Sequence, residues 1–310
     1  MDPRFVTPAQ FAAGGEPGRR LRREASRGTF VRVRPGLYLP ADDWQQFSAR
    51  ERHLAAIRAL LARAGPHVVV SHASAGAVWG FPVLDEWPQR VQVIAHCRTT
   101  GKVTSRVVLH PSRLAVEVSI VRGVRCTSAS RTAVDMGLAG GFLSALLAFD
   151  YALATGLVTR QELRDEIALR SGFRGIAAVR SALEIAHPGS KSAGESISKG
   201  QIHLLGFETP ELQKKFTCPG GRTYYGDFWW KTVGQIGEFD GGQKYLDERM
   251  RGGRTMEQVL FDEKDRTDAL LALPEVRNIV RWRYAVARNP TRLQEILLRA
   301  GIPLRDSRRR

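Results

Sequence analysis

The chain has 310 residues and an unbalanced charge: 47 Lys and Arg residues stand against 31 Asp and Glu residues, a formal net charge of +16. A chain of about this length usually forms two or three domains, and a composition of 43% hydrophobic and 25% charged residues excludes disorder throughout. The positive charge favours a polyanionic partner, with nucleic acid first and an anionic membrane surface second.

The termini, the apolar runs and the cysteines indicate where in the cell the protein functions and whether it contacts a membrane. The first twenty residues contain no apolar run that would make a secretory signal. The longest apolar stretch, residues 142–158, carries Asp150 and is too short to span a bilayer. Cys97, Cys126 and Cys218 are far apart, without a CxxC pair or histidines at zinc-finger spacing. We therefore expect a cytoplasmic protein with reduced thiols and no membrane partner.

The pattern of elements predicts a mixed α/β (α+β) fold in three domains. Residues 1–40 indicate helix, helix and hairpin, the arrangement of a small winged helix. Residues 41–187 indicate a mixed α/β middle domain that ends in helices. A Pro/Gly/Ser-rich linker at 188–192 then opens a third αβ domain, residues 188–310, with a basic tail.

The first domain contains residues that typically begin and end helices and form turns. Thr7 can cap a short helix that ends at the Gly14-Gly15 pair, and Pro17 can open a second helix that stops before Gly28. Residues 30–34 alternate as a strand and return through a Pro-Gly turn.

Seven arginines and one glutamate lie between positions 19 and 34. Arg20, Arg23 and Arg27 are spaced i, i+3 and i+7, so they share a helix face. This density predicts contact with DNA, mostly with its phosphates. The alternative is an ordinary solvated basic face. The candidate DNA-binding residues are Arg19, Arg20, Arg23, Arg27, Arg32 and Arg34.

In the middle domain, capping boxes at Ser48 and Thr159 predict helix starts. Helices are expected to dominate from 128 to 187. His72 follows a buried strand and precedes a small-residue helix, and we interpret it as a packed or capping residue. Asp135 is expected to pair with Arg131. Strands are predicted at 68–70, 91–95, 106–109 and 116–121.

The strongest chemical signal lies in the third domain. Residues 224–230 and 235–240 are both strand-like and are separated by a four-residue hairpin loop. If the hairpin is symmetric about that loop, Asp227 lies directly opposite Glu238. Asp240 then shares the face of Glu238, because side chains alternate along a strand.

Directly opposed carboxylates repel one another unless a cation lies between them. Mg²⁺ or Mn²⁺ fits such a position, because it takes one or two carboxylates and completes its shell with water and phosphate oxygens. The alternative is two exposed acids on an ordinary hairpin. Glu195 has a plainer interpretation, since Ser192 and Glu195 have the spacing of a capping box.

These residues resemble the PD-(D/E)xK nuclease superfamily, and more narrowly the very-short-patch-repair-like endonuclease domain. The resemblance rests on Glu195-Ser196, on residues 225–230 and 236–241, and on a helix and strand that follow at 261–270 and 279–282.

The resemblance implies that Asp227 and Glu238 are metal carboxylates, that Asp240 is a further ligand and that Glu195 is the acid on the helix. Asp240 occupies the position at which the motif has a lysine that orients the attacking water. Lys244 or Lys264 would replace that lysine.

The front of the chain resembles the AbiEi-type antitoxins and transcriptional regulators, through residues 30–38, 70–75 and 127–135. The resemblance implies a winged helix that binds operator DNA, followed by an α/β domain that supports repression and neutralises a cognate toxin.

Together these features predict a DNA-binding protein with a Mg²⁺- or Mn²⁺-dependent endonuclease domain, in defence against foreign DNA or in toxin–antitoxin-like regulation. A non-enzymatic antitoxin or regulator, in which the nuclease fold only binds, is the competing hypothesis. An RNA-directed version ranks last, because the basic helix has no aromatic platform for stacking bases.

Overall fold

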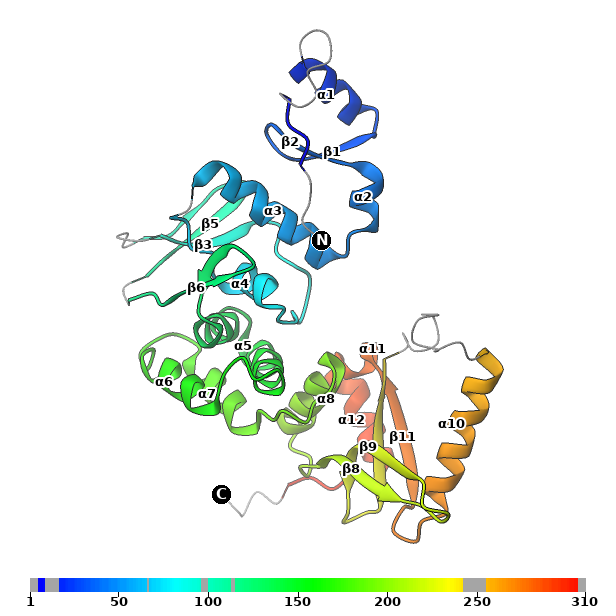
Figure 1. The fold of residues 1–310 in the computed structure, drawn as a ribbon. Helices are drawn as coiled ribbons and strands as arrows, with labels where there is room; N and C mark the ends of the chain where they lie inside the picture. The colour runs from blue at the N-terminus through cyan, green and yellow to red at the C-terminus, as the bar shows by residue number, and fades with distance from the viewer. Residues whose placement is uncertain are drawn as a thin grey trace. The chain divides into compact units, whose positions relative to one another are not determined.

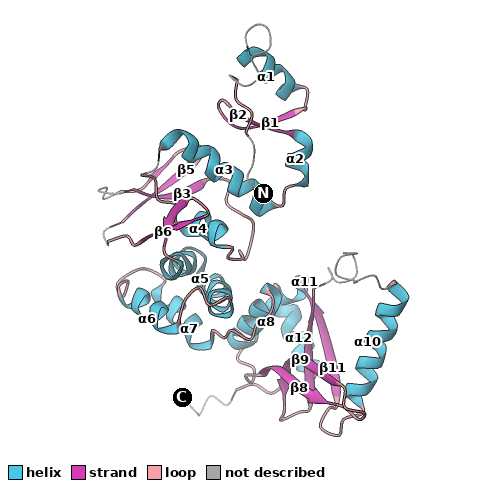
Figure 2. Cartoon of the chain, viewed as in Figure 1, coloured by secondary structure: helices cyan, strands magenta, loops and turns pink. Residues whose placement is uncertain are grey.

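The structure is a computed structural model that describes residues 5–8, 17–65, 67–95, 100–112, 115–241 and 255–305. The predicted mixed α/β class is confirmed, with helices and several small sheets (Figure 2). The chain divides into two compact units: residues 1–144 with 157–176, and residues 145–156 with 177–310. The three-domain division at residues 40 and 187 stays a prediction.

The first unit opens with a helix and a hairpin. Helix α1 runs over Pro17–Ser26. Strands β1 (Phe30–Arg34) and β2 (Leu37–Pro40) pair antiparallel around a Pro-Gly turn, as predicted. The short helix predicted from Thr7 to Gly15 falls mostly outside the described residues.

Three helices and two small sheets, β3-β5-β4 and β6-β7, follow. Helices α2 (Ala41–Gln46) and α3 (Ala49–Ala64) precede α4 (His72–Trp79), and the capping box predicted at Ser48 is present. Residues 68–70 make isolated bridges through Val70 rather than the predicted strand. The strands here are β3 (Val91–Ala95), β4 (Lys102–Val103), β5 (Val107–Pro111), β6 (Val118–Val121) and β7 (Val124–Thr127).

Helices cover residues 129–185, as predicted. They are α5 (Ala129–Ala154), α6 (Arg160–Ala168) and α7 (Ile176–Ile185). Among the described residues α5 alone has the length and apolar composition of a membrane span, but 61% of its most apolar window is buried. Gly141, at φ 78°, also interrupts its helical backbone. These are properties of a core helix, and they give no support for a span.

The second unit contains a four-stranded sheet in the order β11-β10-β9-β8. Strand β10 is parallel to β11, and the other neighbouring strands are antiparallel. Its elements are α8 (Ala193–Leu204), β8 (Glu211–Thr217), β9 (Thr223–Trp230), β10 (Gln235–Asp240), α10 (Met256–Leu271), β11 (Asn278–Arg283), α11 (Tyr284–Ala287) and α12 (Pro290–Arg299).

Helices flank this sheet on both faces, with α8 and α12 on one side and α10 on the other (Figure 1). Trp229 and Ile236 pack against Leu270 of α10. On the opposite face, Phe239 of β10 lies so close to α8 that a Cβ at Gly194 would overlap its ring. A glycine at this position lets the helix approach the sheet and brings the next residue, Glu195, to the sheet surface.

Candidate functional site

The hairpin register predicted from the sequence is confirmed for the three residue pairs next to the loop, while the pairing of Asp227 with Glu238 stays a prediction. Strands β9 and β10 are joined by residues 231–234, and Gln235, Ile236 and Gly237 pair with Trp230, Trp229 and Phe228. Beyond these pairs, β10 is joined to β9 through a side chain: Asp227 Oδ2 accepts a hydrogen bond from the Phe239 backbone N–H at 2.9 Å. Asp227 is therefore held in place by the strand that carries Glu238.

The structure brings Asp227 together with Glu195, and Gln213 joins them. The Gln213 Nε2 donates to Glu195 Oε2 and to Asp227 Oδ1, at 3.0 Å in each case. Gln213 lies on β8 between Leu212 and Lys214, whose partners Phe228 and Gly226 flank Asp227 on β9. The Gln213 backbone is left-handed, with φ 51°. The local distortion of β8 thus places one neutral amide between two carboxylates.

The first turn of α8 positions Glu195. Ser192 caps the helix, because its Oγ accepts from the Glu195 backbone N–H. The Glu195 carboxylate accepts in return from the Ser192 hydroxyl at 2.9 Å and from the Lys191 backbone N–H at 3.0 Å. The Ser192 cap is therefore present, but the predicted capping box is incomplete, because the Glu195 carboxylate accepts from the Lys191 N–H and not from the Ser192 N–H. The same carboxylate also meets Asp227 at the Gln213 amide.

Burial, and next the nearby charge of Asp227, raise the pKa of Glu195 above its ordinary value. Burial and the Asp227 charge thus outweigh the hydrogen bonds that the Glu195 carboxylate accepts. A cation at this point would relieve the repulsion.

The raised pKa of Glu195 predicts a pH dependence of stability. Because the folded-state pKa lies above the unfolded one, the free energy of unfolding should fall as pH rises from about 4.5, the ordinary value, through the raised pKa. Above that pH it should level off. Glu195→Gln should abolish this decline in urea unfolding curves measured without divalent metal between about pH 4 and pH 8.

Glu162 provides a control of opposite sign. Hydrogen bonds from the Thr159 backbone and side chain lower its pKa, so its contribution is present above the ordinary value and is lost as pH falls. Glu162→Gln should leave the decline due to Glu195 in place. An identical pH profile for wild type and Glu195→Gln would contradict the assignment.

Glu238 is held by two arginines. Its Oε1 accepts from Arg266 of α10 at 2.5 Å, and its Oε2 accepts from Arg281 of β11 at 2.8 Å. The side chain of Glu238 is only 8% exposed. Burial alone would lower the pKa of Arg266, but Glu238, Glu263 and Asp227 raise it, so this guanidinium stays charged. Both carboxylate oxygens of Glu238, a predicted metal ligand, therefore form ion pairs with arginines.

Asp240, Lys244 and Lys264 are the remaining candidate residues. Asp240 pairs with Arg283, its register partner on β11, at 3.4 Å. Lys264 is exposed on α10, and Lys244 lies outside the described residues. Within the described ranges, no three His, Cys, Asp or Glu side chains are arranged to hold a metal ion.

The basic surface predicted on α1 and β1 is present. Leu21 is fully buried and anchors α1, while Arg19, Arg20, Arg23 and Arg27 are exposed. On the hairpin, Arg32 is exposed and Arg34 is half-buried. Burial, and next the nearby Arg106, lower the pKa of Arg34. Helix α1 thus buries Leu21 and exposes its arginines to solvent.

Contacts in the first unit support the interpretations of His72 as a packed residue and of Asp135 as a partner of Arg131. Arg131 Nε donates to Asp135 Oδ2 at 2.7 Å, as predicted. His72 stacks on His110 with ring centroids 3.6 Å apart, and Asp135 lies 4.0 Å from its Nδ1. Burial lowers the pKa of both imidazoles, to about 4 for His110. These side chains form a packed polar core.

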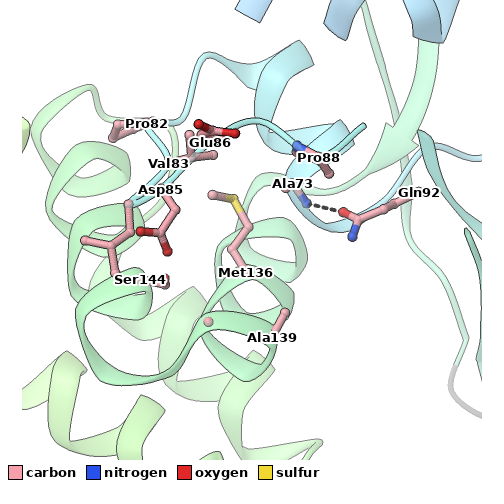
Figure 3. A pocket seen from close by; sticks show the side chains of 12 residues that line it. Ala73, Pro82, Val83, Asp85, Glu86, Pro88, Gln92, Met136, Ala139 and Ser144 are labelled. Atoms are coloured by element: carbon pink, nitrogen blue, oxygen red, sulfur yellow. Dashed lines mark hydrogen bonds between the residues drawn. The ribbon is translucent and has the colours of Figure 1, made fainter. Parts of the chain in front are cut away.

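Each of the two units contains a cavity. One in the first unit, of about 190 Å³, is lined by Asp85, Met136 and Ser144, and Ala73 donates to Gln92 beside it (Figure 3). The other, of about 440 Å³, lies in the second unit beside Lys199. Neither cavity is lined by a residue that the sequence singled out.

Comparison with known proteins gives relatives without a described activity. The chain is 27% identical over 278 residues to uncharacterized proteins from two strains of Mycobacterium tuberculosis, and the alignment covers 84% of this chain and 97% of each relative. No protein-family model matches the chain. The similarity therefore extends along most of the chain but transfers no function to it.

Proposed function

We propose that this protein binds DNA and that its second unit is a divalent-metal-dependent endonuclease-like domain. The observation that carries the proposal is the pair Glu195–Asp227, a buried and a half-buried carboxylate that both accept from the Gln213 amide, in a chain of net charge +16. Two carboxylates that meet at one amide offer oxygen ligands to a divalent cation, and the positive charge of the chain suits a polyanion.

The residues present fit Mg²⁺ or Mn²⁺ at two carboxylates. Glu195 and Asp227 would hold the ion, since Mg²⁺ commonly takes only one or two carboxylates and leaves the other positions to water and phosphate oxygens. When bound, the ion would supply charge stabilisation at a scissile phosphate and an activated water. Gln213 would keep the two carboxylates at a fixed separation, and Phe239 would orient Asp227 through its backbone N–H.

The order of elements supports the nuclease-like resemblance. The acid-bearing helix α8 precedes the strand of Asp227 and the strand of Glu238, and α10 and the parallel strand β11 follow. The AbiEi-like front supports a role in defence against foreign DNA or in regulation with a cognate toxin. A cytoplasmic location is part of this proposal.

One observation favours a second candidate, a non-enzymatic regulator or antitoxin. Both oxygens of Glu238 are occupied by Arg266 and Arg281, so a metal would have to compete with two cations for that carboxylate. In this alternative the acid-bearing sheet only supports the fold, and the basic helix alone binds DNA.

Metal titration and cleavage separate the two candidates. The nuclease proposal expects calorimetric binding of Mg²⁺ or Mn²⁺ to the full chain and nicking or linearisation of supercoiled plasmid that stops with EDTA. DNA binding without metal binding and without cleavage would establish the regulator instead. Absence of DNA binding would contradict both.

The arginines of α1 predict a steep salt dependence. Each lost phosphate contact should lower the slope of log K against log [salt] by about 0.9 for duplex DNA. The triple variant Arg20→Ala, Arg23→Ala and Arg27→Ala should therefore flatten the slope by up to about 2.7, as measured by fluorescence anisotropy with EDTA present.

A matched variant removes three arginines elsewhere. Arg164, Arg174 and Arg180 are exposed, so replacing them with alanine changes the net charge equally. This control should leave the slope close to that of the wild type. Equal flattening in both triple variants would show that only overall charge matters, and α1 would lose its assigned role.

A further inference from the structure

An exposed aromatic side chain lies beside the acidic pair. Tyr225 of β9 is 47% exposed, and the Lys191 Nζ lies 5.0 Å from the centroid of its ring. Lys215 of β8 is the register partner of Tyr225. Because cross-strand partners share a face of the sheet, Lys215 and Tyr225 project to the same side. The exposed ring of Tyr225 thus has two lysines as neighbours, Lys191 and Lys215.

The same residues are tied to the carboxylates. The Lys191 backbone N–H donates to Glu195 Oε2 at 3.0 Å, and Tyr225 is two residues from Asp227 along β9. The Tyr225 carbonyl accepts from Arg266 at 2.9 Å. The strand and the start of α8 therefore fix the ring next to the proposed metal site.

This chemistry suits a nucleotide. An exposed aromatic ring stacks on a base without regard to its identity, and lysine ammoniums neutralise phosphates. Bases inside a duplex have both faces covered by their neighbours, so a single ring on a sheet suits a base that is unpaired.

We propose that Tyr225, with Lys191 and Lys215, forms a nucleotide platform that holds a single-stranded or unpaired segment of DNA at the Glu195–Asp227 pair. The inference rests on the proposed function and names the form of substrate at that site. Helix α1 differs, because its residues Pro17–Ser26 include no aromatic side chain. The chain would therefore bind DNA in two ways: through phosphates alone on α1, and through phosphates and a stacked base in the second unit.

The test measures binding of single-stranded DNA to the full chain in EDTA, so that cleavage does not interfere. An oligonucleotide carries a fluorescent base analogue whose emission is quenched by stacking. Wild type should quench the analogue, and Tyr225→Ala should lose the quenching and bind about five- to hundred-fold more weakly. Tyr225→Phe should retain both properties, because the ring remains.

Two variants make the result specific. Tyr284→Ala removes a tyrosine that is 43% exposed on α11 and should bind as the wild type does. Replacing Lys191 and Lys215 with alanine should flatten the salt slope for single strands by about 1.4, and this holds even if Tyr225→Ala fails to fold.

The platform is overturned if Tyr225→Ala quenches and binds single strands as the wild type does, or if the double lysine variant keeps the full salt slope. Either result can occur while the wild type still binds metal and cleaves plasmid, so failure of the platform is distinct from failure of the proposed function. Weaker binding by Tyr284→Ala to the same extent would also overturn it.

Discussion

Replacement of Asp227 by asparagine should abolish divalent-metal binding and reduce plasmid cleavage at least about a hundred-fold, with the fold retained. Asparagine keeps an oxygen for the Phe239 N–H, which Asp227 accepts at 2.9 Å, but it removes one of the two negative charges of the pair. Cleavage of supercoiled plasmid and calorimetric titration with Mg²⁺ and Mn²⁺ measure the two effects.

The comparison with Glu238→Gln distinguishes the two carboxylates. Glu238 already binds Arg266 and Arg281, so its loss should chiefly lower the free energy of unfolding, because two guanidiniums lose their partner. Metal affinity should fall less than in Asp227→Asn. Asp268→Asn changes an exposed acid on α10 and should behave as wild type. Equal cleavage by wild type, Asp227→Asn and Glu238→Gln would contradict the assigned site.

The largest loss of stability is expected at Asp150. This carboxylate, 1% exposed, accepts from Lys199 Nζ at 2.7 and 2.8 Å and from the His187 backbone N–H at 2.7 Å. Asp150→Ala leaves a buried ammonium without its counter-charge, which typically costs about 3–5 kcal/mol. Since whole domains are stable by about 5–15 kcal/mol, urea unfolding should show a much lower midpoint or an unfolded chain.

Two further variants separate loss of the ion pair from loss of charge alone. Glu211→Ala removes the exposed pair with Lys214 and should cost less than about 1 kcal/mol. Combining Asp150→Leu with Lys199→Met replaces the buried pair by apolar side chains and should recover much of the loss. If Asp150→Ala costs no more than Glu211→Ala, the buried pair does not contribute to stability as proposed.

Local patterns predicted much of the fold. The hairpin loop at 231–234 followed from two strand-like runs around a short polar segment, and the register followed from symmetry about that loop. The capping boxes at Ser48 and Thr159 were predicted because their hydrogen bonds join residues three apart. The pairing of Arg131 with Asp135 follows from helical spacing in the same way.

The partners of the acidic residues were not predicted. Strand β8 was absent from the predicted elements, and with it Gln213, although its pairing with β9 could have been proposed from the run that precedes the turn at 218–222. Arg281 reaches Glu238 only because β11 returns parallel to β10 after α10. A parallel pairing across a crossover helix leaves no short-range spacing in the sequence.

The sequence by itself therefore determined the mixed α/β class, the basic α1 surface and the hairpin formed by β9 and β10. These depend on the periodicity of neighbouring residues and on charge, which are local properties. Only the tertiary structure decided that the carboxylates of Glu195 and Asp227 meet at the Gln213 amide, while Glu238 is paired with Arg266 and Arg281. The reason is physical: the charge balance of a carboxylate is set by the side chains that surround it, and here they come from strands and helices distant in the chain.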